Sequence, residues 1–450
     1  MNNNQNQPRE FDVVLGGENP APVTGVVLGG IEGVKRRLES ENEEARIAAI
    51  RDALNYEDEE LNLLIKAIFE EIKERLGSDD ESNRIAGLKD ALNYGDEGLS
   101  LLVQALNNYS GEIYQDMIWR LRKSGYKGKK VLLNYNPWLV LATFRDWKDE
   151  HWFGGHNIDS PTYGGCYVSN KKSLIKVINH SEVKKIKSLK CEMYYRDRNY
   201  KTAFQDFVDT IVEAKDSLVN LKALRIGDEC VTYNVKYLNS RISVCNIYPI
   251  LAAYPKLKLL HIRGKMYQED VFIPDNKILA VHNIKNKLAV SAKTFKHESL
   301  KTLIIDADGI SDKNLAKLCN LDLPSLEYLE IWLNRGDSHN ISIQSLAPIL
   351  AGKYCQNLVY LAIRNSKNTT ELVKAIVDSP IINSLKILEI TDGNIRSDGA
   401  RALLESPAID RLHTLNVSAS GLDANTIEKL SQLNCRVITE ASHRYYSVWE

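Results

Sequence analysis

The sequence predicts a repeat protein in two parts, in which an α-helical solenoid is followed by an α/β solenoid with a face of parallel strands. Two internal repeats support this fold class. Residues 35–68 recur at 73–106, an offset of 38 residues, with 19 of 34 positions identical. In the second half, a pattern of three apolar residues, separated by two variable positions and then by one, occurs seven times. Periods of about 20 to 50 residues are typical of solenoids, in which each repeat buries its apolar face against its neighbours.

We expect five segments along the 450 residues. They are an N-terminal arm (1–30), helical repeats (31–125), an aromatic connector (126–185), the α/β repeat domain (186–438) and a C-terminal tail (439–450). The net charge is −1 and 44% of the residues are apolar, so no strong overall field favours nucleic acid or an anionic membrane. The charge is uneven, because residues 39–81 hold 15 acidic against 5 basic residues and residues 171–201 hold 10 basic against 3 acidic residues.

The cysteines and the N-terminus indicate where the protein is expected to act. The seven cysteines are widely spaced and include no C-x-x-C pair, which favours a reduced, cytoplasmic protein. Residues 1–10 are polar and lack the basic and apolar regions of a secretory leader. No apolar run approaches the roughly 18 residues of a membrane span. We therefore expect neither secretion nor a membrane partner.

The N-terminal arm carries V-V-L-G-G twice, at residues 13–17 and 26–30. Paired glycines suggest a phosphate loop, but neither G-x-x-x-x-G-K-[ST] nor G-x-G-x-x-G occurs. We therefore expect turns and two short apolar anchors that pack on the first helices, and no nucleotide cofactor.

Each copy of the 38-residue repeat is predicted to form a helical hairpin. The shared core is R-I-A-x-x-x-D-A-L-N-Y, and apolar residues at helical spacing form one stripe before and another after an acidic break. A third, diverged copy is expected at residues 113–121, ending near the breakers Gly125 and Gly128. We interpret the equivalent arginines Arg46 and Arg84 as structural, either paired with nearby carboxylates or capping a neighbouring helix.

Residues 11–106, with their doubled L-G-G strings and D-A-L-N-Y hairpins, resemble a region at the N-termini of multidomain cyanobacterial proteins with HEAT-like helical repeats. That region is similar in style to phycobilisome lyases. The resemblance implies a cyanobacterial source and an adaptor role, because the region is found attached to different partner domains. It implies no particular activity.

The connector holds a dense group of aromatic side chains at residues 135–167, which we expect to wedge between the two repeat domains. His151, His156 and Cys166 suggest a metal site within it. Two histidines five residues apart, with a cysteine ten residues further on, match no zinc-binding spacing and lack a fourth ligand. We therefore expect a glycine-rich loop packed by its aromatics, and no metal.

The α/β repeats are predicted to pair one strand with one helix each. An irregular first strand is expected at residues 186–191, and Ser311, Ser397 and Asp423 stand where a side chain can cap the next helix. The strand copies start at Leu221, Leu257, Leu300, Leu326, Leu358, Leu385 and Leu412.

This pattern resembles the leucine-rich repeat of the ribonuclease-inhibitor-like subtype, and residues 186–438 are similar to bacterial leucine-rich-repeat proteins of unassigned role. The resemblance implies a concave face of parallel strands with helices behind it. The chain departs from the family because most copies lack an asparagine at the strand exit, where Asn334 is the clearest candidate.

Strand alternation predicts that positions three, five and seven of each copy line the concave face. Trp, Tyr and Arg dominate the hot spots of protein interfaces, and large side chains of these types gather at the centre of this face. The alternatives are that the rings stack on one another across parallel strands, or that an insertion covers them. The predicted partner-binding residues are Tyr328, Glu330, Trp332, Tyr360, Arg364, His261 and Arg263.

We expect a non-enzymatic scaffold or adaptor that binds an unidentified protein partner, with no small-molecule substrate and no cofactor. No G-x-S-x-G, H-E-x-x-H or nucleotide-loop motif is present. One alternative is a bilin lyase or phycobiliprotein chaperone, which rests on the helical-repeat resemblance alone. The other is a nucleic-acid-binding protein that uses Lys184, Lys185 and Lys187, whose affinity would fall steeply with salt.

Overall fold

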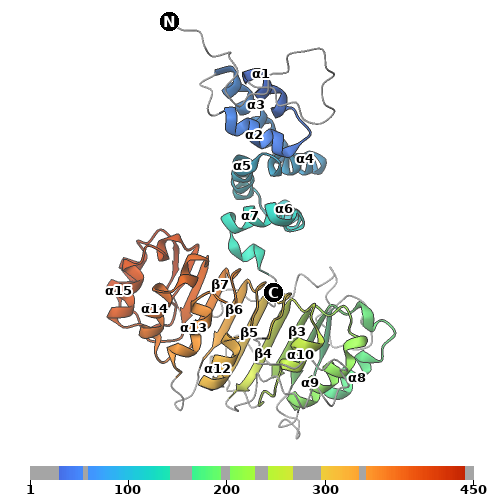
Figure 1. Ribbon diagram of the computed structural model, residues 1–450, viewed down its shortest axis with the longest axis vertical. Coiled ribbons are helices and arrows are strands. Elements are labelled where there is room, and N and C mark those ends of the chain that lie inside the picture. The colour runs from blue at the N-terminus through green and yellow to red at the C-terminus, as the bar shows by residue number, and fades with distance from the viewer. Residues whose placement is uncertain are drawn as a thin grey trace, which may run out of the picture. The chain divides into compact units, whose positions relative to one another are not determined.

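The computed structural model describes residues 30–53, 59–141, 165–193, 203–228, 242–266, 295–333 and 341–440 (Figure 1). The chain divides into two compact units, Met1–Val140 and Leu141–Glu450. The first, the helical unit, contains helices, and the second, the sheet unit, combines parallel strands with helices in an α/β repeat fold. Within the described residues, no helix combines the length and the apolar character needed to cross a membrane.

The helical unit is a series of short helices, each packed on its neighbours. The two copies of the 38-residue repeat supply the helix pairs α2–α3 and α4–α5, as the periodicity predicts. The described helices are α1 (Gly30–Leu38), α2 (Glu43–Ala53), α3 (Glu59–Leu76), α4 (Glu81–Leu92), α5 (Gly95–Asn108), α6 (Gly111–Lys123) and α7 (Gly125–Tyr135), followed by a 3-10 turn at Pro137–Val140.

The equivalent arginines of the two repeats have the same structural role. Arg84 Nη1 donates to Ser78 O at 2.9 Å and to Asp79 O at 2.7 Å, and Arg46 Nη1 donates to Ser40 O. Each acceptor lies in the turn that follows the preceding helix, where backbone carbonyls have no partner within the helix. Both arginines therefore have a structural role, because each holds the turn that leads into its own helix.

Two glycines allow the helices to pack backbone against backbone. A Cβ atom at Gly98 would lie 1.9 Å from Ala91 O, and a Cβ atom at Gly128 would lie 1.9 Å from Leu121 O. Within the pair α4–α5, and likewise within the pair α6–α7, the second helix therefore approaches the backbone of the first through a glycine. Gly125 begins α7 with a φ of +66°, a left-handed conformation that glycine adopts without steric cost.

The observed elements divide the chain differently from the predicted segments. Helix α6 ends at Lys123, next to Gly125 as predicted. The chain continues into a further helix, α7, because the positive φ of Gly125 turns it and Gly128 lets α7 pack on α6. The last part of the predicted connector forms β1, helix α8 and a 3-10 turn of the sheet unit. His151, His156 and the side chain of Cys166 lie outside the described residues.

The sheet unit is built on a parallel sheet in which the described strands follow one another in chain order. The strands are β1 (Gly165–Val168), β2 (Ser188–Met193), β3 (Ala223–Asp228), β4 (Leu259–Met266), β5 (Thr302–Ile310), β6 (Tyr328–Trp332), β7 (Tyr360–Arg364), β8 (Ile387–Thr391), β9 (Thr414–Asn416) and β10 (Arg436–Ile438). The first strand predicted, at residues 186–191, is therefore observed as β2, two residues later, and β1 precedes it.

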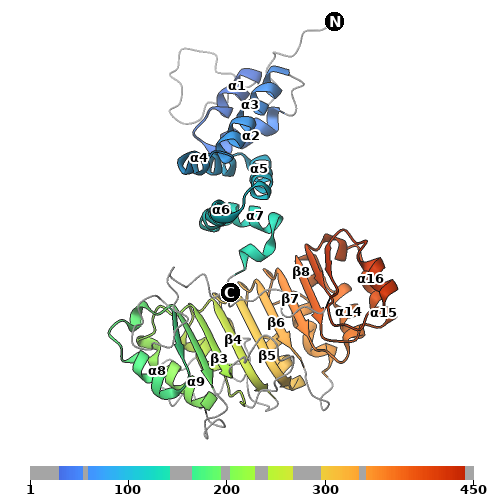
Figure 2. The same ribbon diagram turned by 180° about the vertical axis from the view of Figure 1, so that it is seen from behind.

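Helices and 3-10 turns connect the strands and lie along one side of the sheet, as the two opposite views show (Figures 1 and 2). The helices are α8 (Lys171–Ile178), α9 (Ala203–Glu213), α10 (Tyr248–Ala253), α12 (Asp312–Cys319), α13 (Ala347–Leu350), α14 (Thr369–Val377), α15 (Ser397–Glu405) and α16 (Ala424–Leu430). The 3-10 turns are Val183–Lys185, Ala214–Asp216, Ile343–Leu346, Pro380–Asn383 and Ile409–Arg411.

The core of the sheet unit lies between the sheet and these helices, and the apolar positions of the repeat fill it. Leu358, Leu361 and Ile363 of one copy are all fully buried. In the register between β6 and β7, Leu329 is opposite Leu361 and Ile331 is opposite Ile363, so equal positions of successive copies form ladders. Each such side chain stabilises the fold by about 1.5–3 kcal/mol when fully buried.

Two of the three predicted helix caps are observed. Ser311 Oγ accepts from Asn314 N at 3.2 Å, and Asp423 Oδ1 accepts from Thr426 N at 2.8 Å. The prediction for Ser397 is wrong, because Ser397 is the first residue of α15 and the preceding arginine stands at the cap without a side-chain cap bond.

Three strand exits adopt the left-handed conformation at intervals of 27 residues. Asn365, Asp392 and Ala419 have φ values of 57°, 58° and 53° and occupy position eight of three successive copies. Asn and Asp tolerate this conformation better than other non-glycine residues. Asn334, the candidate from the sequence, stands one position later in its own copy, at position nine, and lies outside the described residues.

His297 is a buried histidine whose two hydrogen bonds require a neutral ring. Its Nδ1 accepts from Leu300 N at 3.1 Å, so Nε2 carries the proton that it shares with Tyr254 O at 3.1 Å. Burial lowers the pKa of His297 below its usual value, although the bond to Tyr254 opposes the shift. Protonation would also place a second N–H against the Leu300 donor.

The stability of the sheet unit is therefore expected to fall as the pH drops below about 6.5, the ordinary histidine pKa. In that range the unfolded chain binds a proton that the folded chain excludes, which costs up to about 1.4 kcal/mol per pH unit for one histidine. Urea unfolding of the wild type and of His297→Gln between pH 8 and pH 5 checks this. The variant should show a shallower pH dependence, and equal slopes would contradict the assignment.

Candidate functional site

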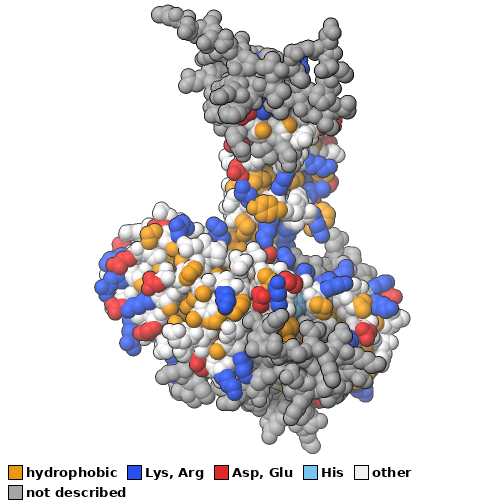
Figure 3. Space-filling view, in the orientation of Figure 1, with side chains coloured by type: hydrophobic (Ala, Val, Ile, Leu, Met, Phe, Trp, Pro, Cys, Tyr) orange, Lys and Arg blue, Asp and Glu red, His pale blue; other side chains and the backbone are white. Residues whose placement is uncertain are grey.

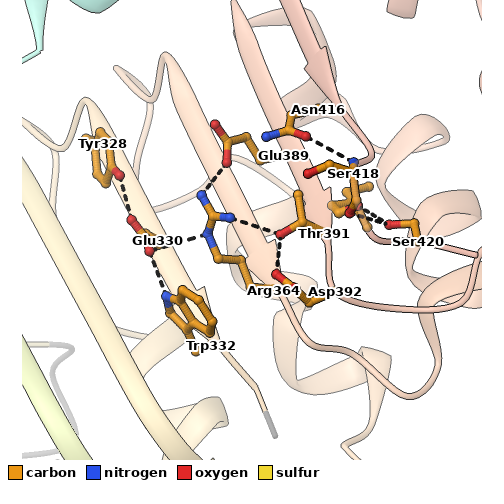
Figure 4. Close-up of polar contacts among 11 residues, drawn as sticks. Tyr328, Glu330, Trp332, Arg364, Glu389, Thr391, Asp392, Asn416, Ser418 and Ser420 are labelled. Atoms are coloured by element: carbon orange, nitrogen blue, oxygen red, sulfur yellow. Dashed lines mark hydrogen bonds and ion pairs between the residues drawn. The ribbon is translucent and has the colours of Figure 1, made fainter. Parts of the chain in front are cut away.

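The predicted surface lies on the face of the sheet away from the helices, where alternate side chains of β6, β7 and β8 meet (Figure 4). Tyr328 lies opposite Tyr360 and Trp332 lies opposite Arg364 in the register of β6 and β7. Arg364 in turn lies opposite Thr391 of β8. Side chains at such positions interact directly across neighbouring strands.

The two tyrosines form a stacked pair within this face. Their ring centroids are 4.0 Å apart with an interplanar angle of 18°, and both side chains are almost completely buried. Burial, assisted by the nearby carboxylate of Glu389, raises the pKa of Tyr360 well above its usual value. Tyr360 is therefore uncharged at physiological pH.

Glu330 joins three of the predicted residues through its two carboxylate oxygens. Oε2 accepts from the hydroxyl of Tyr328 at 2.6 Å, and Oε1 accepts from Nε1 of Trp332 at 2.6 Å. Oε1 also lies 3.4 Å from Nε of Arg364. Glu330 itself is fully buried, so its charge is balanced by these neighbours instead of by water.

Arg364 stands at the centre of the contacts between β6, β7 and β8. Its Nη1 donates to Thr391 Oγ1 at 3.0 Å, its Nη2 forms an ion pair with Glu389, and its Cζ lies 5.3 Å from the ring centroid of Trp332. Burial alone would lower the pKa of Arg364, but the carboxylates of Glu389 and Glu330 raise it well above its usual value. The guanidinium is therefore permanently charged.

Glu389 experiences the opposing effects of burial and of the arginine. Burial raises its pKa, the charge of Arg364 lowers it, and the net pKa is above the usual glutamate value. One arginine thus faces two fully buried carboxylates, which makes the arrangement dependent on every member.

The other two predicted residues lie on β4, with β5 between them and this group. Arg263 Nη1 donates to Asp306 Oδ2 at 2.5 Å, and both side chains are buried. His261 is also buried, and lies between Arg225 and Ile304 in the sheet register. The structure therefore brings five of the seven predicted residues into one group and leaves His261 and Arg263 outside it.

Exposure separates the seven predicted residues into two classes. Six are buried, with at most 6% of the residue surface exposed, and only Trp332 is half-buried. The tyrosine stack agrees with the expected alternative that aromatic rings pack across neighbouring strands. Trp332 is therefore the member of the set that has side-chain surface to offer a partner.

The sequence-based choice missed two partners of Arg364, namely Glu389 and Thr391. Both occupy face positions of the next copy, five and seven, where they reach the arginine at position seven of the preceding copy. The sequence did contain a signal for the ion pair, because opposite charges stand at positions five and seven of adjacent copies. The same rule finds Arg225, which pairs with Glu192 of the preceding strand at 2.5 Å.

Among the described residues, no group of three His, Cys, Asp or Glu side chains is placed to hold a metal ion. The described cysteines are free thiols, and burial raises the pKa of the Cys355 thiol to about 11. Such a protonated thiol is a poor nucleophile.

Neither a protein-family profile nor a curated protein matches the sequence. Among solved structures, the chain is similar to a crystal structure of a protein from Bacteroides fragilis that was a structural genomics target. The two share 20% sequence identity over 63% of this chain and 75% of that chain, with a TM-score of 0.48. These values are too low to support an argument about function.

Proposed function

We propose that this chain is a non-enzymatic protein-binding scaffold whose sheet unit is a leucine-rich-repeat array, and that a partner protein docks on the strand face at Trp332. The observation that supports the proposal is the state of this ring. Trp332 is half-buried, while the groups that hold it, Glu330 and Arg364, are buried. Tryptophan anchors of this kind are frequent in interface hot spots.

The indole is already fixed before a partner arrives. Its N–H donates to Glu330 at 2.6 Å and the guanidinium of Arg364 lies over its ring. Ordering a flexible side chain on binding costs about 0.5–1.5 kcal/mol, and a ring held in this way avoids much of that cost. Glu330 and Arg364 thus hold the anchor in place from below the surface.

The charged groups of the strand face favour a structural role over a catalytic one. Arg225 pairs with Glu192, Arg263 pairs with Asp306, and Arg364 pairs with Glu389. A general acid or base has to exchange its proton with a substrate, whereas these carboxylates are engaged by arginines across the sheet. This arrangement supports a binding scaffold and no catalytic step.

Trp332→Ala is expected to reduce capture of the partner at least about tenfold, since removing a hot-spot tryptophan costs about 2 kcal/mol or more. The tagged full chain and the variant are compared by quantitative mass spectrometry of proteins captured from a cyanobacterial lysate, the source that the sequence resemblance suggests. Leu63→Ala is the control, because Leu63 is an exposed apolar side chain on α3 of the helical unit.

A protein captured by the wild type and by Leu63→Ala, but lost with Trp332→Ala, is the expected result. Circular dichroism should show both variants folded. Equal capture by folded Trp332→Ala and the wild type would contradict docking at this ring.

Nucleic-acid binding is a second candidate, because Lys184, Lys185 and Lys187 are all exposed next to β2. Lys185 forms an ion pair with Glu182, which reduces its availability for a phosphate. Gel-shift titration against single-stranded RNA at two salt concentrations tests this candidate. Binding that weakens steeply with salt and is lost in a triple Lys→Gln variant would favour it.

A further inference from the structure

A second surface with binding character lies on the helical unit. A cavity of about 580 Å³ opens where the end of α4 meets the turn between α6 and α7. It is an open depression of the surface, and its volume falls within the range of about 300–1,000 Å³ that ligand clefts occupy. The lining residues are Lys89, Leu92, Asn93, Ser124, Tyr126 and Lys127.

The turn between α6 and α7 sets the shape of this cavity. Ser124 ends α6, with its backbone N–H donating to Arg120 O at 3.0 Å, and Gly125 reverses the chain with its positive φ. Tyr126 and Lys127 follow at once in the first turn of α7. The close approach of α7 to α6 at Gly128 holds these two residues on the cavity wall.

Exposed aromatic side chains are concentrated in this hairpin. Tyr126 is 81% exposed and Trp119 of α6 is 57% exposed. Lys123 Nζ lies 5.7 Å from the ring centroid of Trp119. Figure 3 shows hydrophobic and basic side chains gathered over α6 and α7. Large aromatic rings left in solvent beside a cavity are a common feature of interaction sites.

The charge of the cavity selects an acidic partner. Residues 117–135 contain six basic residues and no acidic residue. Arg120 is neutralised by Asp116 and Glu81, and Lys130 by Asp96. The cavity wall itself holds two lysines and no carboxylate. Complementary charge at such a site sets the specificity and speeds the encounter with a partner.

We propose that this cavity docks a short acidic segment of a partner protein, with an Asp or Glu carboxylate held by Lys89 and Lys127 and an apolar side chain packed on Tyr126. The surface belongs to the helical unit and does not depend on the strand face around Trp332. Two linked surfaces that engage one assembly would raise the effective affinity.

The surroundings of the cavity favour a peptide over nucleic acid. A nucleic-acid strand needs a continuous basic track along its backbone, with aromatic platforms for successive bases. Beyond the cavity wall the surface carries carboxylates, including Asp90, Asp96 and Asp116, each bound to an arginine or a lysine. If the cavity bound one phosphate of a nucleic-acid strand, these carboxylates would lie near the next phosphates of that strand and repel them.

Selection from a phage-displayed library of random twelve-residue peptides tests the proposal. The full chain is the target and a Lys89→Gln, Lys127→Gln double variant is the counter-target. Peptides with Asp or Glu next to Leu, Phe or Trp should be enriched on the wild type alone. Synthetic copies of these peptides should bind Tyr126→Ala at least about tenfold more weakly in fluorescence anisotropy, because the variant loses the ring that packs the apolar side chain.

Lys66→Gln and Leu63→Ala are the matched controls, since both side chains are exposed on α3 of the same unit, and both variants should bind like the wild type. Trp332→Ala should also bind normally, which separates this surface from the strand face. Enrichment of peptides without carboxylates, or equal enrichment on the double variant, would overturn the proposal. The proposal would also be overturned if the wild type bound a fifteen-residue oligo-dT more tightly than the selected peptides and the double variant lost that binding. Such a result would assign the cavity to nucleic acid.

Discussion

Arg364→Ala is expected to lower the free energy of unfolding of the sheet unit by about 3–5 kcal/mol, the usual cost of breaking a buried ion pair by removing one partner. The arginine is the positive group between Glu330 and Glu389, and both carboxylates are fully buried. Without it, two like charges would face each other in a medium that screens them poorly. Hydrogen exchange of the β6–β8 amides, which reports the free energy of opening, measures this loss.

Arg401→Ala provides the matched control. Arg401 pairs with Asp398 three residues earlier on α15, and both side chains are more than half exposed, so its loss is expected to cost under about 1 kcal/mol. Equal effects of Arg364→Ala and Arg401→Ala would show that the buried pair contributes no more than a surface pair.

The same comparison has a defined pH dependence. The folded-state pKa of Glu389 is raised above its usual value by burial, and removal of Arg364 would raise it further. Above the pKa that Glu389 has in the folded variant, the carboxylate is charged and the cost of the variant is complete. As the pH falls below that pKa, toward the unfolded glutamate value of about 4.3, Glu389 takes up a proton and the cost shrinks. A defect of Arg364→Ala that stays constant from pH 8 to pH 5 would contradict this account of the buried carboxylates.

Gly128→Ala is expected to destabilise the helical unit by at least about 2 kcal/mol, within the usual cost of overpacking. The added methyl group would lie 1.9 Å from Leu121 O and 2.7 Å from Leu121 C. Since both are backbone atoms, no side-chain rotation relieves the clash, and α7 has to move away from α6. The higher helix propensity of alanine, about 1 kcal/mol, only partly offsets this.

Gly77→Ala is the control for this substitution, because the nearest atom to its added Cβ would be Lys73 O at 3.4 Å, and its effect should stay within about 0.5 kcal/mol. Hydrogen exchange should show the loss of protection with Gly128→Ala in α6 and α7 and unchanged protection in β5–β8. Protection of α6 and α7 equal to that of the wild type would show that the helices do not depend on the close approach.

The strand pattern was predictable because its chemistry is local and repeated. Each of the seven copies begins its strand at position three, as at Ala223, Tyr328 and Thr414. Two apolar side chains separated by one variable position define which face of a strand is buried. The ladder of buried leucines then fixes the register between neighbouring copies.

The boundary of the helical unit was less predictable, because glycine has two opposite uses. Gly125 and Gly128 were interpreted as helix breakers, and α6 does end next to Gly125. However, Gly125 also begins a new helix, and Gly128 lies inside that helix, where it allows close packing. Strand β1 was missed because its four residues, G-C-Y-V, carry no copy of the pattern and are paired only through β2.

The face positions of the candidate site followed from alternation, but their partners did not. Whether Arg364 meets solvent, a partner protein or Glu389 depends on the reach of two side chains that lie 25 residues apart, on adjacent copies. The low exposure of Tyr328 and Tyr360 likewise follows from their stacking on each other. A strand pattern encodes which face a residue lies on, and tertiary contacts decide how much of it remains accessible.

The claim that Trp332 anchors a partner protein is tested most directly by site-specific photocrosslinking. A benzoylphenylalanine at position 332 of the full chain keeps an aromatic group on the strand face. The same residue at position 63, which is exposed on the helical unit, serves as the control. Illumination in the lysate should join position 332 to the protein that Trp332→Ala fails to capture. Crosslinks from position 332 that stay within the chain, while that protein is still captured, would contradict the account.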